Sequence, residues 1–171
     1  ELVTERARAK EILFEYNNLH PSEMEKRTEI LKHFLGATGK QLLIEQPFRC
    51  DYGYNIRVGE NFYANMGCTI LDEALVTFGD NVLLAPNVSI YTAGHAVNVA
   101  QRIVGWEYAY PVTVGHNVWI GGNVVILPGV SIGDNSIIGG GSVVTKDIPA
   151  NVIAVGNPCK VIRELTEDEL K

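Results

Sequence analysis

Apolar residues recur at a spacing of six through the second half of the chain. One aliphatic residue opens each strict repeat: Val114, Ile120, Ile126, Ile132, Ile138 and Val144. A second small or branched residue follows four positions later: Val118, Val124, Val130, Ser136, Ser142 and Ile148. The pattern also occurs upstream in two groups of three, separated by a slip of two residues: Val58, Ala64, Ile70 and then Phe78, Leu84, Ile90. Twelve hexads in related phases indicate an internal repeat.

A period of six fits neither an α-helix nor an alternating hairpin sheet. It predicts a mainly β fold, a parallel β-helix of hexapeptide repeats in which short flat strands are separated by turns at fixed intervals. One aliphatic residue per hexad would point into a prism-shaped core, and Gly or Asn would occupy corners that need positive φ. Each coil then buries its apolar face only by stacking on the next coil. The period does not determine the handedness.

The start of the chain follows a helical pattern instead. Apolar residues recur there at helical spacing: Ala9, Ile12, Leu13, Tyr16 and Leu19. His20-Pro21 interrupts the pattern, and Ser22 with Glu25 forms an S-x-x-E sequence typical of a capping box for a second helix. Gly36 is the expected end of that helix.

The hexad repeats are interrupted once, and this interruption together with the helical start divides the chain into its expected segments. We predict an N-terminal helical segment at 1–40, a β-helix at 41–158 and a C-terminal tail or helix at 159–171. Within the β-helix, one extruded loop at 91–112 has the sequence YTAGHAVNVAQRIVGWEYAYPV and contains His95. A single loop histidine is ordinarily a solvated side chain. Because a solenoid that extrudes one long loop usually does so for function, His95 becomes a candidate catalytic residue.

Composition narrows the class of protein. The 171 residues are 46% hydrophobic and 20% charged, typical of one globular domain with a real core. The net charge of −6, without a basic block, argues against a nucleic-acid partner. No apolar stretch approaches the roughly 18 residues of a membrane span. The three cysteines (Cys50, Cys68, Cys159) form no C-x-x-C pair, which favours reduced thiols in a cytoplasmic protein over disulfides or a zinc site.

Five longer strings are more specific than the hexads. They are ERARAKEILFEYNN, FRCDYGYNIRVGENFYANMGCTILD, YTAGHAV, PVTVGHNVWIGGNVVILPGVSIGDNSIIGGGSVVTKDIP and GNPCKVIREL. Together they resemble the maltose/galactoside O-acetyltransferases, a family of hexapeptide-repeat acyltransferases. The resemblance implies a left-handed β-helix and a cytoplasmic homotrimer with active sites between subunits. It also implies transfer of an acetyl group from acetyl-CoA to a sugar hydroxyl, with no metal required.

His95 matches the catalytic histidine of that family. A neutral imidazole can take the proton of a sugar hydroxyl as that hydroxyl attacks the thioester, and can return it to the leaving CoA thiolate. The transfer would be direct, without a covalent acyl-enzyme. A preorganised N–H donor must meet the developing oxyanion, and the family supplies it from the hexad after the tryptophan, here Gly121-Gly122.

The resemblance also assigns residues to acetyl-CoA, in a groove between coils of neighbouring subunits. The matching positions are Trp119, Gly122, Gly140, Thr145, Lys146, Lys160 and Arg163. Lys160 and Arg163 match basic residues that lie near the phosphates of the cofactor in the family. This match is physically reasonable, since an acidic protein needs a local cluster of cations to hold an anionic cofactor. Taken singly, each cation is equally a solvated surface charge, and Trp119 can instead pack between subunits.

Three residues match family positions that hydrogen-bond the hydroxyls of the acceptor: Asp51, Asn65 and Asp72. Asn65 and Asp72 are equally suited to cap corner turns. Glu73 is a further polar residue that can reach the substrate, and Glu107 is a candidate partner that orients His95. The family also carries an acidic substrate-contacting residue upstream of the position where this sequence starts.

The sequence disfavours one alternative and leaves two open. A carbonic anhydrase on the same fold needs three converging histidines, but His20 and His33 lie in the helical start and His116 lies in the repeats, away from His95. A xenobiotic O-acetyltransferase would acetylate an antibiotic hydroxyl through the same histidine. A non-catalytic trimeric β-helix would use its repeats only to build a surface.

Overall fold

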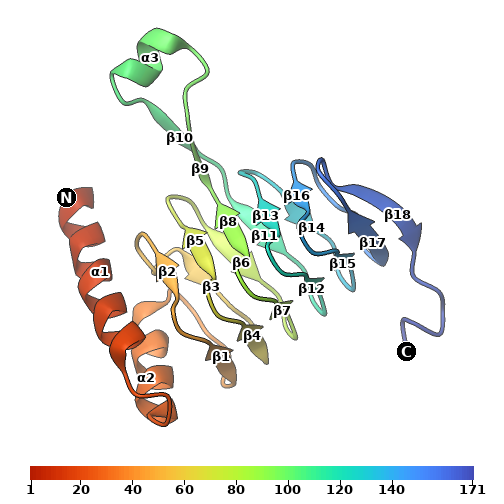
Figure 1. Cartoon of the computed structure of the whole chain (residues 1–171), viewed down its shortest axis with the longest axis horizontal. Helices are drawn as coiled ribbons and strands as arrows, with labels where there is room; N and C mark the ends of the chain where they lie inside the picture. The colour runs from red at the N-terminus through yellow and green to blue at the C-terminus, as the bar shows by residue number, and fades with distance from the viewer.

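Short parallel strands coil into a three-sided prism in the computed structural model, which describes all 171 residues (Figure 1). Sheet 1 contains β1 (Leu42–Ile44), β4 (Phe62–Ala64), β7 (Leu83–Leu84), β12 (Trp119–Ile120), β15 (Ile137–Ile138), β17 (Val152–Val155) and β18 (Lys160–Glu164). Sheet 2 contains β3 (Ile56–Arg57), β6 (Val76–Phe78), β11 (Val112–Val114) and β14 (Ser131–Ile132). Sheet 3 contains β2 (Arg49–Cys50), β5 (Thr69–Leu71), β8 (Ser89–Tyr91), β13 (Val125–Ile126) and β16 (Val143–Val144). The chain therefore visits sheets 1, 3 and 2 in turn, and the predicted parallel β-helix is confirmed.

The hexad residues form the core of the prism. All twelve predicted aliphatic positions are buried, and so are the six partners that follow them in the strict repeats. Because these residues stack from coil to coil, most of them join one continuous apolar cluster that extends into the N-terminal helices. The period of six therefore predicted the inward-facing positions correctly.

Asparagines build one corner of the prism. Seven asparagines have positive φ: Asn61, Asn81, Asn87, Asn117, Asn123, Asn135 and Asn151. Five of them form a ladder in which each side-chain amide donates to the next side-chain oxygen at 2.7–2.9 Å: Asn61, Asn81, Asn117, Asn135 and Asn151. The glycines that follow the hexad aliphatics act differently, because coils pass close to them. A Cβ on Gly121, for example, would lie 2.6 Å from the backbone nitrogen of Gly140.

Two helices cover the first coil, α1 (Leu2–Asn18) and α2 (Met24–Phe34). The predicted capping box is wrong. Glu23, not Ser22, is the residue before α2, and the Ser22 hydroxyl bonds the His20 ring instead. The Glu23 carboxylate accepts the N–H of His20, so this turn is closed before the helix begins.

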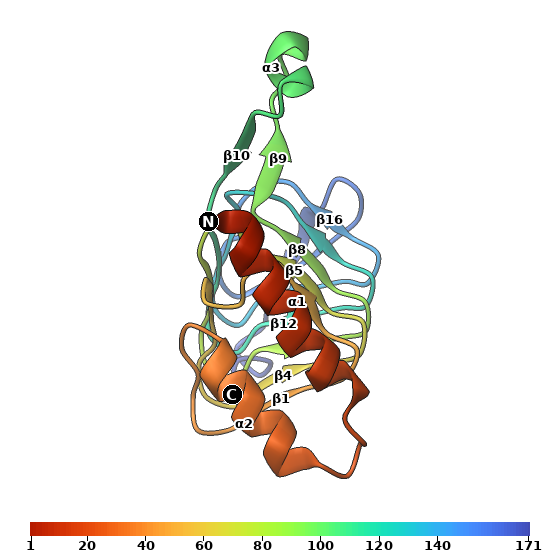
Figure 2. The same ribbon diagram turned by 90° about the vertical axis from the view of Figure 1, so that its left-hand side faces the viewer.

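Polar anchors attach the helices to the coils. The Asn17 side chain exchanges two hydrogen bonds with the backbone of Phe48, at 2.8 and 2.9 Å. The buried guanidinium of Arg27 donates to the carbonyl of Ile44 at 3.0 Å and pairs with Glu45 at 3.1 Å. Figure 2, which looks at the helical end, shows α1 and α2 lying across the end of the prism.

The extruded loop is an antiparallel ribbon of β9 (Ala93–His95) and β10 (Glu107–Ala109), closed at its tip by α3 (Val99–Ile103). It projects well away from the coils in both ribbon views (Figures 1 and 2). The end of the chain differs from the expected tail or helix. β18 pairs antiparallel with β17, and the residues after it contain turns but no helix. β18 thereby covers what would otherwise be the open edge of sheet 1. No helix of the chain is long and apolar enough to cross a membrane.

Candidate active site

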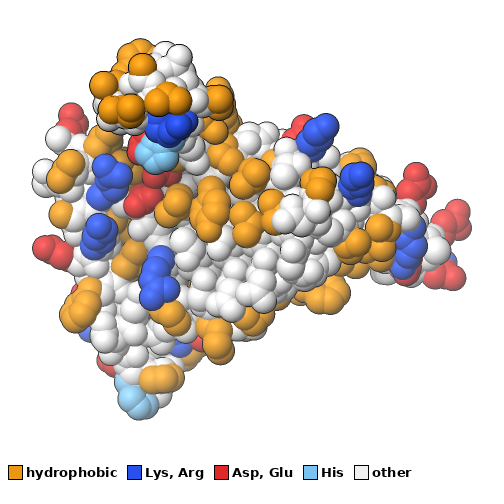
Figure 3. All heavy atoms as spheres, turned by 45° about the horizontal axis from the view of Figure 1, so that its top comes forward, with side chains coloured by type: hydrophobic (Ala, Val, Ile, Leu, Met, Phe, Trp, Pro, Cys, Tyr) orange, Lys and Arg blue, Asp and Glu red, His pale blue; other side chains and the backbone are white.

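The ribbon places His95 opposite Glu107. The two residues are register partners in the β9–β10 pair, and His95 Nδ1 lies 3.6 Å from Glu107 Oε1. Their side chains are 61% and 50% exposed, so both remain accessible. A carboxylate beside Nδ1 orients an imidazole and leaves Nε2 free to exchange a proton. Figure 3 shows histidine and acidic side chains together beneath the tip of the loop.

Tyr108 packs across the ribbon at the residue before the histidine. A Cβ on Gly94 would lie 2.5 Å from the Tyr108 hydroxyl, so Gly94 leaves the space that the phenol occupies. The Tyr108 ring also contacts the Tyr110 ring, with 5.3 Å between centroids. This packing holds the base of the ribbon, and with it the strand that carries His95.

Acidic side chains gather where the strands of sheet 3 end. β2, β5 and β8 pair in parallel, so the residues that follow them lie one above another along one corner. Asp51 follows β2, and Glu73 lies two residues beyond β5. Burial, together with the hydrogen bond and charge of Asp51, raises the pKa of Glu73 to about 7. The two carboxyls therefore form a pair beside the point where the ribbon leaves the coils.

Asp72 differs from the expectation that it contacts the acceptor. It is 0% exposed, and its carboxylate accepts hydrogen bonds from the backbone N–H groups of Asp51 (3.0 Å), Tyr52 (2.8 Å) and Gly53 (2.8 Å). Burial raises the pKa of Asp72 despite these three bonds. Asp72 therefore holds the turn after β2, as in the alternative corner-capping interpretation, while its neighbour Glu73 faces the pocket.

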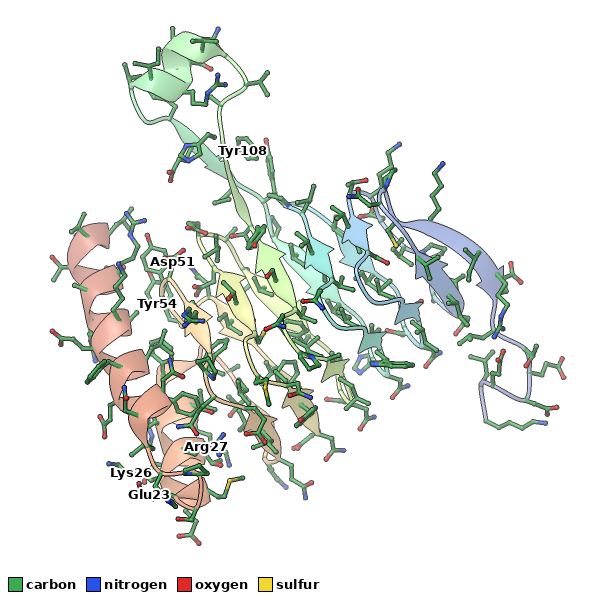
Figure 4. The ribbon with its side chains drawn as sticks, viewed as in Figure 1. Glu23, Lys26, Arg27, Asp51, Tyr54 and Tyr108 are labelled. Carbon is green, nitrogen blue, oxygen red and sulfur yellow. The ribbon has the colours of Figure 1, made fainter.

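A cavity of about 220 Å³, which we call the ribbon pocket, lies between α1, the coils and the ribbon. Its lining consists of Leu2, Arg6, Tyr52, Tyr54, Asn55, Glu73, Ala93, Glu107, Tyr108 and Ala109. The Arg6 guanidinium lies over the Tyr52 ring, 5.9 Å from its centroid. In Figure 4, Asp51 and Tyr54 lie between α1 and the first coils, below the ribbon that carries Tyr108. The pocket thus combines a cation, an amide and two carboxyls with aromatic walls.

Asn65, Gly122 and Gly140 lie on a different corner, where sheet 1 meets sheet 3. They follow β4, β12 and β15, which are strands of sheet 1. Gly141 donates its N–H to the Gly122 carbonyl at 2.8 Å, whereas the Gly122 N–H makes no backbone hydrogen bond. The Asn65 side chain accepts the N–H of Met66 at 2.8 Å. The predicted site residues therefore fall on two corners, separated by the width of sheet 3.

The remaining candidates for the cofactor lie toward the end of the chain. Thr145 and Lys146 follow β16 and are exposed, and Lys160 begins β18. Arg163 is held in two 2.7 Å hydrogen bonds by the Glu169 carboxylate. Neither Lys146 nor Lys160 makes an ion pair within the chain, so these two ammonium groups are free for an anion.

Two family signatures match separate parts of the chain, and relatives match nearly its whole length. Bacterial transferase hexapeptide (six repeats) matches residues 111–146, and the maltose acetyltransferase hexapeptide capping motif matches residues 1–39. A putative acetyltransferase of Saccharomyces cerevisiae is 55% identical over 169 residues, covering 99% of this chain and 86% of the relative. Galactoside O-acetyltransferase of Escherichia coli is 52% identical over 166 residues, covering 97% and 82%. The chain belongs to the hexapeptide-repeat acetyltransferases.

Solved structures of this family superpose closely. A galactoside acetyltransferase in complex with coenzyme A has a TM-score of 0.96 at 51% identity, covering 99% of this chain and 84% of that one. A maltose O-acetyltransferase from Clostridium difficile 630 also has a TM-score of 0.96, at 56% identity, covering 97% and 89%. The resemblance seen in the sequence strings is thus confirmed.

This hexapeptide-repeat acetyltransferase carries an apolar ladder on the outer face of sheet 1. The outward residues pair from strand to strand: Leu43, Tyr63, Leu83, Trp119, Ile137 and Ile153. The corresponding residues of sheet 2 are polar: Arg57, Thr77, Thr113 and Ser131. Trp119 is 52% exposed in the middle of the ladder, which agrees with packing against another surface as well as with cofactor contact.

Sequence reasoning missed part of the ribbon pocket. Arg6, Tyr52, Tyr54 and Asn55 line it, yet none was singled out. Arg6 lies in the helical segment, and only its off-stripe position on α1 could have drawn attention to it. No group of three or more His, Cys, Asp and Glu side chains is arranged to hold a metal ion in the chain.

Proposed function

We propose that this protein transfers the acetyl group of acetyl-CoA to a hydroxyl of a sugar acceptor, with His95 as general base. The observation that carries the proposal is the His95–Glu107 pair on the ribbon, whose Glu107 also lines the ribbon pocket beside Arg6, Asn55 and Glu73. The relatives support the chemistry, because one is named a galactoside O-acetyltransferase and a similar solved structure contains coenzyme A.

The residues of the site divide the reaction between them. Acetyl-CoA supplies the activated thioester carbonyl. His95 Nε2 takes the proton of the acceptor hydroxyl as its oxygen bonds to that carbonyl carbon, and it returns the proton to the thiolate sulfur when the C–S bond breaks. The Glu107 carboxylate stabilises the imidazolium between these two steps. The free N–H of Gly122 donates to the carbonyl oxygen as negative charge develops on it.

The proposed catalytic groups lie on two different corners of one protomer, which supports a homotrimer. His95 and Glu107 lie where sheet 3 meets sheet 2, whereas Gly122 and Gly140 lie where sheet 1 meets sheet 3. We therefore propose that the ribbon of one protomer faces the Gly122 corner of its neighbour, with one active site at each contact. The apolar ladder of sheet 1 offers a face that cyclic symmetry can cover without leaving an open filament.

The acceptor and the cofactor occupy different parts of this interface. Glu73 and Arg6 bind acceptor hydroxyls in the ribbon pocket, and Asp51 contributes beside it as the hydrogen-bond partner of Glu73. Asn65 reaches the acceptor from the neighbouring corner. The proposed cofactor contacts are Trp119, Gly122, Gly140, Thr145, Lys146, Lys160 and Arg163. Arg163 contributes to phosphate binding once Glu169 releases it. The need for acetyl-CoA and the three free cysteines support a cytoplasmic location.

The test follows thiol release from acetyl-CoA with glucose, maltose, a galactoside and chloramphenicol as acceptors. Wild type is compared with His95→Ala and with His116→Ala, a matched control whose histidine lies at a corner and accepts the N–H of Asp80. Sugar-dependent release that His95→Ala alone abolishes supports the proposal. Release only with chloramphenicol identifies a xenobiotic O-acetyltransferase instead. Unchanged release in His95→Ala contradicts the mechanism.

A further inference from the structure

His95 stands at the open end of the ribbon. The His95–Glu107 pair is the last register pair of β9 and β10 before the loop tip. Beyond it, only the Ala96 N–H continues the pairing, donating to the Trp106 carbonyl at 3.2 Å. The carbonyls of Ala96 and Val97 accept no backbone hydrogen bond. The proposed general base therefore lies where the pairing of the two strands ends, which is where strands fray most readily.

The Arg102 side chain closes this end of the ribbon. From α3 it reaches back over the turn, and its Nη1 donates to the carbonyl of Ala96 at 2.9 Å and to that of Val97 at 3.0 Å. Arg102 is the only Lys or Arg in the loop at 91–112, and it makes no ion pair within the chain. The guanidinium is thus engaged by the two carbonyls that directly follow the histidine.

Short-range hydrogen bonds hold α3 in place to present this side chain. The Asn98 side chain accepts the N–H of Gln101 at 3.1 Å, and the Asn98 carbonyl accepts the N–H of Arg102 at 3.0 Å. The Trp106 N–H donates to the Gln101 carbonyl at 3.0 Å. Because Trp106 also pairs with Ala96, α3 is connected to both strands of the ribbon.

The residue before the histidine is held by a different side chain. The Tyr108 ring packs on Gly94, its register partner in the ribbon (Figure 4). His95 is thus held through Tyr108 on the side of the coils and through Arg102 on the side of the tip. Tyr108 lines the ribbon pocket, whereas Arg102 does not. A substitution of Arg102 therefore tests the backbone position of His95 without removing a wall of the acceptor pocket.

We propose that Arg102 is a positioning residue for the general base: it holds the strand so that His95 Nδ1 faces Glu107 and Nε2 faces the acceptor. The inference rests on the proposed function, because it concerns the same base. Without the guanidinium, the two carbonyls bond water, the last pair of the ribbon opens, and His95 spends part of its time away from Glu107. A misplacement of about 1 Å near the reacting groups can cost about 10²-fold in rate.

The experiment compares thiol release from acetyl-CoA, with a sugar acceptor, in wild type and three variants. Arg102→Met keeps the aliphatic stem and loses the donors, so we expect kcat to fall about tenfold with the KM for acetyl-CoA unchanged. Arg102→Lys should restore most of kcat, because a single nitrogen makes both hydrogen bonds and an ammonium group has donors for both. Gln101→Ala is the matched control, since Gln101 is exposed on the same helix and its side chain makes no hydrogen bond within the chain.

The tautomer of His95, measured by ¹⁵N NMR of the imidazole at pH 8, separates positioning from a general loss of structure. His95→Ala identifies the signal among those of the four histidines. Wild type should show one tautomer, with the proton on Nδ1 toward Glu107. Arg102→Met should show a mixture of tautomers at an unchanged melting temperature.

Wild-type kcat in Arg102→Met overturns the inference. A raised KM for acetyl-CoA at unchanged kcat also overturns it, because Arg102 is then a cofactor contact. So does a loss of kcat with the wild-type tautomer, since the base is still in place. If wild type acetylates no sugar, the proposed function fails, and that result is distinct from sugar turnover that needs His95 and not Arg102.

Discussion

In the strict repeats, two side chains of every six are directed inward and buried, whereas in the extruded loop apolar side chains face outward. Ile126 in β13 is 0% exposed, but Ile103 in α3 is 78% exposed. Val97, Val104 and Trp106 near the loop tip are also largely exposed. The coils therefore supply stability and spacing, while the loop supplies the histidine and an apolar surface that the chain itself does not bury.

The sharpest test of this division is His95→Ala. We expect kcat to fall by about 10²–10⁴, the usual contribution of a positioned base, with the melting temperature unchanged. Steady-state thiol release and thermal unfolding measure the two effects on the same protein. A large loss of stability would mean that the ribbon also supports the fold.

The converse substitution is Ile126→Ala in a coil. Removing a buried aliphatic side chain should cost about 2–5 kcal/mol of unfolding free energy, because a cavity remains among packed neighbours. Ile103→Ala, its exposed counterpart in the loop, should change stability by about 0.5 kcal/mol or less. Denaturant unfolding of both variants measures the difference. Equal costs would show that the loop tip is packed in solution.

The substitution Glu107→Gln tests whether kcat depends on the negative charge of Glu107 or only on the size of its side chain. The amide keeps the size of the side chain but loses the charge that stabilises the His95 imidazolium. A charge-assisted hydrogen bond exceeds a neutral one by about 1–1.5 kcal/mol, so we expect kcat to fall about tenfold. Activity of Glu107→Gln at the wild-type level would remove the carboxylate from the mechanism.

Glu73→Gln gives the smallest expected effect and depends on pH. The pKa of Glu73 is raised from 4.5 to about 7, so the folded protein binds this proton more tightly than the unfolded chain. The contribution of Glu73 to stability is thus fully present below pH 4.5 and is lost as pH rises through about 7. After allowance for solvent screening, removing the charge should raise the melting temperature by about 2–4 °C at pH 8. At pH 4.5 the variant and wild type should melt alike, and a gain of equal size at both pH values would assign the effect to packing.

The coils were predictable because their contacts repeat at nearly constant distances along the chain. Asn117 bonds Asn135 eighteen positions later, and Asn61 bonds Asn81 twenty positions later, which matches the two-residue slip in the hexads. The site was less predictable. Asp72 and Glu73 are sequence neighbours, yet the Asp72 carboxylate accepts hydrogen bonds from backbone N–H groups, whereas Glu73 lines the ribbon pocket.

The end of the chain was also not predictable from the sequence. The strand Lys160–Glu164 has no alternation of apolar and polar residues that would distinguish it from a helix, and it forms because β17 offers an open edge. The two hydrogen bonds that Arg163 donates to the Glu169 carboxylate depend on the turn that brings Glu169 back beside Arg163. Neither contact could be inferred from spacing.

The sequence by itself determined the coil period, the inward residues, the asparagine corner, the extruded loop with its histidine, and the family. Each of these is a local or strictly periodic property, so one hexad predicts the next. Only the tertiary structure decided which acidic residue is free, how α1 adds Arg6 to a pocket shared with Tyr52 and Glu107, and which corner carries each glycine. These features depend on segments without a common period, and their contacts arise only when the helices, the coils and the ribbon pack together.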